Sequence, residues 1–145
     1  MILLDTNVLS ELMRSAPEPK VLRWLDATPA EDVWISAVTV GEIRLGIALL
    51  PEGQRKELLT DLAEAMFDED FADRCLSFDC AAAVHYGSIV ANRTRQGRPV
   101  SVEDGQIAAI ALTAGLTLAT RNTRDFTEID GLIVVNPWNA GITKS

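Results

Sequence analysis

Residues 2–9 read Ile2-Leu3-Leu4-Asp5-Thr6-Asn7-Val8-Leu9, and this segment indicates the architecture of the whole chain. The first three residues form a short, uniformly apolar run, which is typical of a strand buried on both faces of a sheet. Asp5, Thr6 and Asn7 follow directly, and such short polar side chains favour the start of a helix. A buried strand that leads straight into a helix predicts a parallel sheet with crossover helices.

The same alternation of strand and helix continues along the chain. Apolar runs predict further strands at residues 33–35, 75–78, 116–120 and 132–135. Helices are expected at residues 8–16, 19–27, 39–50, 54–67, 79–95 and 101–114. No repeat, low-complexity tract or linker interrupts this pattern, and 145 residues is the size of one ordinary domain. We therefore expect a single domain over residues 1–145 of the α/β class, with helices covering both faces of a central parallel sheet.

Composition limits the class of protein. The 13 basic and 21 acidic residues give a net charge of −8, which argues against nucleic-acid binding through a broad basic face. The charge is still compatible with a nucleic-acid enzyme whose acidic site is neutralised by cations. Two cysteines cannot build a disulfide framework, so we expect a cytoplasmic protein. No apolar run approaches the length of a bilayer span and no secretory signal precedes Ile2, so no membrane association is expected.

Polar residues recur where the predicted parallel strands end. Asp5 ends the first strand, Thr120 ends the strand at residues 116–120, and Asn122 and Asp125 follow that strand. Glu42 and Asp104 lie in the first turns of two predicted helices next to the sheet. Ligands of open parallel sheets bind beyond the carboxyl ends of the strands. The sequence therefore predicts that the three acids converge at one edge.

Converging carboxylates need a compensating charge. Two unit charges 4 Å apart repel by about 4 kcal/mol at an effective dielectric constant near 20. Such a cluster is tolerated if the pKa values rise or a cation binds. Mg²⁺ takes oxygen ligands, and carboxylate-bound ions commonly serve phosphodiester hydrolysis, where one ion activates water and a cation stabilises the leaving oxygen.

Each acid also has a structural interpretation. Thr39-x-x-Glu42 and Ser101-x-x-Asp104 both match the capping box, in which an acidic side chain closes a helix start. Asp5 can likewise cap the first helix or form an Asx turn. These alternatives stay open at the level of the sequence.

Other chemistries find little support. His85 is the single histidine, and with Cys75 and Cys80 it gives at most three soft ligands without a Cys-x-x-Cys pair, so a zinc site is not expected. Glycine-rich nucleotide-binding loops are absent. Haloacid-dehalogenase-like phosphatases need Asp-x-Asp after the first strand, and here Asn7 stands in place of the second acid. Receiver domains need a lysine near the last loop, where none is present.

The chain resembles PIN-domain proteins of the VapC toxin type and is most similar to the FitB-like branch. The segments that carry the resemblance are residues 1–10, 35–46, 103–109, 119–126 and 135–138. The resemblance implies an α/β/α sandwich, a homodimer and a Mg²⁺- or Mn²⁺-dependent endoribonuclease whose products carry a 5′-phosphate and a 3′-hydroxyl. It also implies a small antitoxin partner that blocks the site, and operator DNA as a ligand of the toxin–antitoxin complex.

Site roles are carried over from the resemblance residue by residue. Asp5, Glu42 and Asp104 match the three acids that hold metal, directly or through water. Asn122 occupies a fourth catalytic position that many members fill with Asp, so one ion is favoured over two; Asp125 lies three residues on. The hydroxyls of Thr6 and Thr120, together with Arg121, are candidates for contacting a substrate phosphate or a bound water.

Several arginines are candidates for binding a phosphate backbone. Arg93, Arg95 and Arg98 cluster at one predicted helix end, and Arg121 and Arg124 flank the proposed site loop. They predict a local phosphate track on the rim of the site. The alternative for the first cluster is a solvated helix end, where the helix dipole favours cations.

The function that we expect from the sequence is a metal-dependent RNA endonuclease, the toxin of a toxin–antitoxin pair. A catalytically silent module, acting through antitoxin and operator-DNA complex formation, is the alternative that Asn122 favours. A metal-dependent phosphatase acting on small phosphoesters is a further alternative, which Asn7 disfavours.

Overall fold

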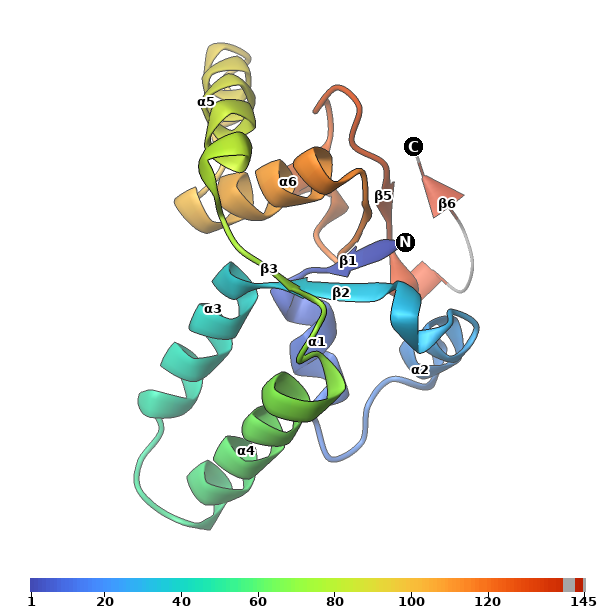
Figure 1. The fold of residues 1–145 in the computed structure, drawn as a ribbon, viewed down its shortest axis with the longest axis vertical. Helices are drawn as coiled ribbons and strands as arrows, with labels where there is room; N and C mark the ends of the chain where they lie inside the picture. The colour runs from blue at the N-terminus through green and yellow to red at the C-terminus, as the bar shows by residue number, and fades with distance from the viewer. Residues whose placement is uncertain (140–142, 145) are drawn as a thin grey trace.

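The computed structural model describes residues 1–139 and 143–144, and its centre is a sheet with the strand order β3-β2-β1-β4-β5-β6 (Figure 1). The strands are β1 (Ile2–Leu4), β2 (Val33–Ser36), β3 (Cys75–Leu76), β4 (Thr117–Ala119), β5 (Val134–Val135) and β6 (Thr143–Lys144). The first five are parallel, and β6 pairs antiparallel with β5. The parallel sheet of the sequence prediction is confirmed.

Helices cover both faces of this sheet. They are α1 (Thr6–Leu12), α2 (Pro19–Asp26), α3 (Ala37–Ala48), α4 (Gln54–Ala65), α5 (Cys80–Arg95) and α6 (Val102–Ala114). Figure 1 shows α5 and α6 on one side of the sheet and α1 to α4 on the other. Successive strand residues point to opposite faces, so Leu3 packs in the core under α5 and α6, whereas Leu4 packs in the core under the other helices. The α/β/α arrangement is confirmed.

The strand order reverses direction between β1 and β4. The chain runs outward from β1 through β2 to β3, returns through α5 and α6 to the other side of β1, and continues outward through β4 and β5. Leu4 pairs with Ala119 in the β1–β4 register, and the Asp5 amide donates to the Ala119 carbonyl at 2.9 Å. Asp5 and Thr120 therefore leave neighbouring strands side by side at the carboxyl edge, where parallel sheets bind ligands.

The boundaries of some elements differ from the sequence prediction. Helix α3 begins at Ala37, because Ser36 caps it by accepting a hydrogen bond from the Thr39 amide at 3.1 Å. Glu42 therefore lies in the second turn of α3 and not in the first. The strands expected at residues 75–78 and 132–135 are shorter, and β6 was not predicted. None of the helices that the structure describes is both long and apolar enough to cross a membrane.

Candidate active site

Asp5 is held by three hydrogen bonds at the end of β1. Its side chain is 4% exposed, and Oδ1 accepts from the Thr6 amide at 2.8 Å, which caps α1. The other oxygen, Oδ2, accepts from Thr120 Oγ1 at 2.8 Å and from Asn7 Nδ2 at 3.2 Å. The capping interpretation of Asp5 is thus confirmed. The cap involves Oδ1 only, and the same carboxylate also lines a cavity.

Glu42 projects from α3 toward the start of α1. Thr6 Oγ1 donates to Glu42 Oε1 at 2.6 Å and also lies 3.0 Å from Thr39 Oγ1. Because Ser36 provides the cap of α3, the capping box predicted for Thr39 and Glu42 does not form. The Glu42 carboxylate instead links α3 to α1 through its hydrogen bond with Thr6.

Asp104 lies in the first turn of α6. Ser101 caps this helix by accepting a hydrogen bond from the Asp104 amide at 3.1 Å, which is the serine half of the predicted capping box. The Asp104 carboxylate itself faces the same cavity as Asp5 and Glu42. The cap and the proposed site role are therefore compatible.

The three acids surround one cavity of about 460 Å³ at the carboxyl edge of the sheet. Its walls also include two other predicted residues, Thr6 and Asn122, and four residues that the sequence prediction did not assign to the site: Asn7, Ser10, Glu11 and Arg14. β1 with α1, the helices α3 and α6, and the loop after β4 thus each contribute side chains to this cavity.

The acids in this cavity disfavour one another's ionisation. Burial raises the pKa of Asp104 to about 6, with further contributions from the negative charges of Asp5, Asp125 and Glu42. Burial also raises the pKa of Asp5, and the charges of Glu42 and Asp125 add to this effect, while the hydrogen bonds from Thr120 and Thr6 oppose it. A bound cation would relieve this repulsion.

The donor set suits a hard cation that keeps part of its water. All three acids offer oxygen atoms, which Mg²⁺ and Mn²⁺ prefer. Among residues 1–139 and 143–144, no group of three or more His, Cys, Asp or Glu side chains is placed to hold a metal ion by itself. Mg²⁺ is commonly bound by one or two carboxylates, with waters and phosphate oxygens completing its shell. The open arrangement of Asp5, Glu42 and Asp104 fits this mode.

Thr120 holds Asp5, Asn7 and Asn122 together beneath the cavity through its hydroxyl group. Its side chain is fully buried, donates to Asp5, and accepts from Asn7 Nδ2 at 3.2 Å and from the Asn122 amide at 3.0 Å. The Arg121 amide in turn donates to Asn7 Oδ1 at 3.1 Å. The Thr120 hydroxyl is therefore fully engaged by protein groups and is not exposed to a substrate.

Residues 2–132 match the PIN domain. The chain is a PIN-domain protein. It is 45% identical over 139 residues to the toxin FitB of Neisseria gonorrhoeae, covering 96% of this chain and 99% of that protein. It is 41% identical over 138 residues to the VapC ribonuclease Y4jK of Sinorhizobium fredii, covering 95% of this chain and 98% of the relative.

The fold of this PIN domain is also found in a solved complex with DNA. A chain in the structure of FitAB bound to the IR36 DNA fragment superposes with a TM-score of 0.88 at 44% sequence identity. The match covers 95% of this chain and 96% of that chain.

Polar residues on α1 and in the turn after it complete the PIN-domain cavity and were missed by the sequence prediction. Asn7 and Ser10 lie at helical spacing on α1, Glu11 lies beside them, and Arg14 follows just after the helix ends at Leu12. This spacing, read together with Asp5 at the helix start, was the signal in the sequence that could have found them.

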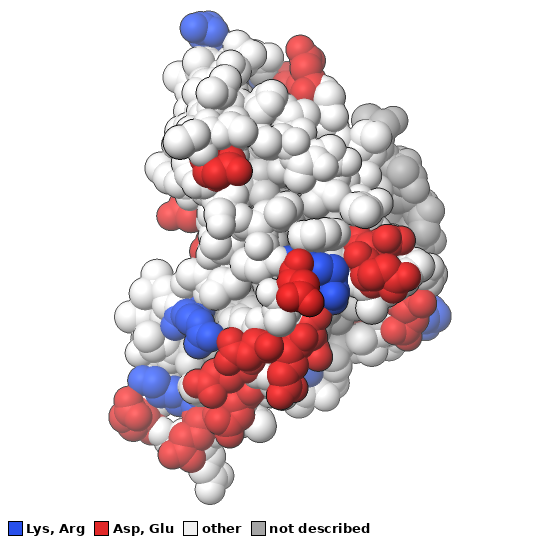
Figure 2. All heavy atoms as spheres, in the orientation of Figure 1, with Lys and Arg blue, Asp and Glu red and all other residues white. Residues whose placement is uncertain are grey.

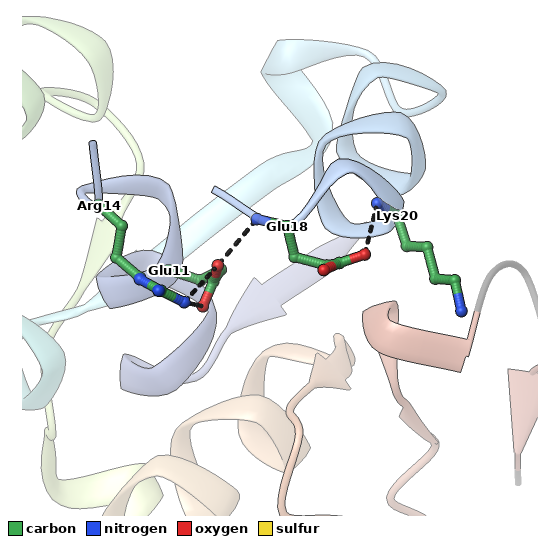
Figure 3. Close-up of polar contacts among 4 residues, drawn as sticks. All are labelled: Glu11, Arg14, Glu18 and Lys20. Atoms are coloured by element: carbon green, nitrogen blue, oxygen red, sulfur yellow. Dashed lines mark hydrogen bonds and ion pairs between the residues drawn. The ribbon is translucent and has the colours of Figure 1, made fainter. Parts of the chain in front are cut away.

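Glu11 is a buried anion with its own partners (Figure 3). Its side chain is 6% exposed, accepts from the Glu18 amide at 2.8 Å, and has both oxygens 3.2 Å from Arg14 Nη1. These contacts lower the pKa of Glu11, first through the Glu18 amide and then through Arg14. Glu11 is thus an ionised anchor that ties α1 to the start of α2 and holds Arg14 at the wall of the cavity.

Arg93 does not belong to the phosphate track predicted at the end of α5. Arg93 is 3% exposed, and its Nη1 donates to the Thr127 carbonyl at 2.6 Å, so it is neither a phosphate ligand nor a solvated helix-end cation. Arg98 pairs with Glu128 at 3.3 Å, while Arg95 is exposed and donates to Asn92. The Arg121 guanidinium lies 4.9 Å from the centre of the Trp138 ring.

Much of the negative charge of this PIN domain gathers elsewhere. Figure 2 shows acidic side chains over α4 and the turn that follows it, a segment that carries Glu57, Asp61, Glu64, Asp68, Glu69 and Asp70. Such a surface repels a phosphate backbone. Arginines near the cavity are therefore the groups to consider for contact with a nucleic acid.

Proposed function

We propose that this protein is a metal-dependent endoribonuclease and the toxin of a toxin–antitoxin pair. The observation that carries the proposal is the cavity onto which Asp5, Glu42 and Asp104 converge, with the pKa of Asp104 raised to about 6. The names of the relatives, a VapC ribonuclease and the toxin FitB, support the same activity.

Each residue has a role in this proposal. Asp5, Glu42 and Asp104 would hold Mg²⁺ or Mn²⁺, which when bound makes water a better nucleophile and stabilises the leaving oxygen of a phosphodiester. Thr120 and Asn7 orient the Asp5 carboxylate, and Thr6 orients Glu42, each by a direct hydrogen bond. Asn122 lines the cavity without a charge and orients a water molecule or substrate oxygen.

The partners follow from the same relationship. We propose that a small antitoxin protein binds this chain and blocks the acidic cavity, and that the pair binds operator DNA as a complex. The structure of FitAB with a DNA fragment supports this assembly. We further propose that the protein forms a homodimer and acts in the cytoplasm.

A catalytically silent binding module is the second candidate. Asn122 favours it, because a neutral amide replaces an acid that would compensate a second cation. In that case antitoxin and operator-DNA binding would be the whole function.

One experiment separates these two functions. Purified, antitoxin-free protein is incubated with total cellular RNA in Mn²⁺ and in EDTA, beside Asp5→Asn and the control Asp61→Asn, which removes an exposed acid on α4. We expect discrete cleavage by the wild type and by Asp61→Asn in Mn²⁺ only, and none by Asp5→Asn. Cleavage by Asp5→Asn at the wild-type rate would refute the site assignment. A folded wild type that neither binds metal nor cleaves would favour the silent module.

A further inference from the structure

A second cavity of about 300 Å³ adjoins the acidic one between α1, α3 and α4. The two cavities share four residues: Thr6, Ser10, Arg14 and Glu42. They are therefore adjacent cavities, together called the groove from here on, with the acids in the first of them. A polymer held with one phosphate at the acids would have its neighbouring nucleotide beside the second cavity.

The walls of the second cavity differ in chemistry from those of the first. Beyond the shared residues, the lining is apolar, from Met13, Ile43, Ile47, Leu50 and Leu59, apart from Gly46 and Arg55. Arg55 is exposed and forms no ion pair with any residue in the described part of the chain. An apolar cavity with Arg14 and Arg55 at its edges suits a flat, uncharged ring that is attached to negatively charged groups.

We propose that this cavity binds the nucleotide next to the scissile phosphate of a single-stranded RNA. The inference rests on the proposed endoribonuclease function and names a specificity pocket for it. Single-stranded RNA is recognised through unstacked bases that rest on apolar, aromatic or guanidinium surfaces, while cations contact the phosphates. The volume lies at the lower end of the range for small-ligand sites, which suits a single base.

Gly46 keeps this cavity open. It lies inside α3, where glycine lowers helix stability by about 1 kcal/mol relative to alanine. A Cβ built on Gly46 would meet no atom within 4 Å, so close packing does not require glycine there. A larger side chain at this position would extend into the groove and not into the core.

Gly46→Leu therefore tests the pocket without threatening the fold. The matched control is Gly87→Leu, because Gly87 also lies inside a helix, is exposed, has no atom within 4 Å of a built Cβ, and lines neither cavity. The substrate is an RNA oligonucleotide that contains a cleavage site mapped with the wild type, together with versions that are abasic at each nucleotide flanking the scissile bond.

We expect Gly46→Leu to lower kcat/KM on the intact oligonucleotide by about tenfold, the loss typical of one stacked base, and Gly87→Leu to leave it unchanged. One abasic position should lower wild-type cleavage by a similar factor and cause no further loss in Gly46→Leu. Arg55→Gln, at an exposed position, should weaken RNA binding and reduce its salt dependence by about one phosphate contact.

Three results would overturn the inference while leaving the nuclease activity intact. The first is equal cleavage by the wild type, Gly46→Leu and Gly87→Leu, and the second is an additive loss of Gly46→Leu and the abasic change at every abasic position. The third is a Gly46→Leu defect that affects only inhibition by the antitoxin. If the wild type does not cleave RNA, the proposed function itself fails. Fluorescence anisotropy with a labelled single-stranded RNA oligonucleotide of mixed sequence then decides the pocket: weaker binding by Gly46→Leu than by the wild type supports it, and equal or absent binding overturns it.

Discussion

Replacing Asp104 by Asn should make the metal-free protein more stable at neutral and alkaline pH. The Asp104 carboxylate shares a cavity with Asp5 and Glu42, and burial together with these charges raises its pKa from 3.8 to about 6. Above that pH the folded state must hold an ionised group that its surroundings disfavour. Asparagine has nearly the same shape and removes the charge.

The magnitude can be worked from the pKa. Each tenfold change in proton affinity corresponds to about 1.4 kcal/mol, so a rise from 3.8 to about 6 is about 3 kcal/mol if fully felt. Asp104 is half-buried, so screening by water reduces this to about 1.5 kcal/mol. Loss of a negative charge at the start of α6 costs about 0.5 kcal/mol. The net gain is about 1 kcal/mol, or about 3 °C in Tm for a chain of this size.

The pH dependence has a definite sign. Because the folded-state pKa is raised, Asp104 contributes stability that is fully present below pH 3.8 and is lost as the pH rises through about 6. The advantage of Asp104→Asn should therefore be absent at pH 4, grow between pH 4 and pH 6, and reach its full size by about pH 7.

Thermal unfolding in EDTA from pH 4 to pH 8 measures this effect, with Glu103→Gln as the control. Glu103 lies in the same first turn of α6 but outside the cavity, so its loss should slightly destabilise the protein at neutral pH. Added Mn²⁺ should raise the Tm of the wild type and that of Asp104→Asn much less. If Asp104→Asn and Glu103→Gln lower the Tm equally at pH 8, the reasoning from charge repulsion is refuted.

Three further changes test the surroundings of the acids. Thr6→Val removes the hydrogen bond to Glu42 and should weaken divalent-ion binding about tenfold in calorimetry, and Thr6→Ser should restore it; equal affinity in both variants would contradict the positioning role. Asn122→Asp should tighten divalent-ion binding, and an unchanged affinity would place this residue outside the metal shell. Glu11→Gln should lower the Tm at pH 7 but not at pH 3, because the lowered pKa of Glu11 contributes stability that is lost as the pH falls; a loss of equal size at both pH values would show that packing and not charge is responsible.

The sheet could be predicted because its strands are short and uniformly apolar. Leu3 and Leu4 pack on opposite faces of the sheet, and both faces are buried. Every position of such a strand is therefore apolar, which makes it recognisable in the sequence. The antiparallel strand β6 could not be predicted, because Thr143 and Lys144 carry no apolar pattern and pair with β5 through the backbone. Backbone pairing at a sheet edge leaves little trace in a sequence.

The acids of the site could be placed because the edge of a parallel sheet is fixed by its topology. The hydrogen bonds that hold these acids could not be predicted, because they join residues far apart in the sequence. Thr6 and Glu42 are separated by 36 positions, and Thr120 and Asp5 by 115. The burial of Arg93 could not be predicted for the same reason. A cationic helix end normally lies in water, but here a carbonyl 34 positions away accepts its hydrogen bond, and the residue is buried.

The charges around the cavity explain how an acidic protein can act on a polyanion. Glu11 is the acid of this cavity that has a paired arginine, since Arg14 contacts it at 3.2 Å. Asp5, Glu42 and Asp104 have no arginine or lysine partner among the described residues, so a divalent ion would offset two of their three negative charges. With Asn122 in place of a fourth acid, a second ion would depend on the charge of an incoming phosphate. A single ion bound in this cavity would both relieve the repulsion among the acids and attract the phosphates of the substrate.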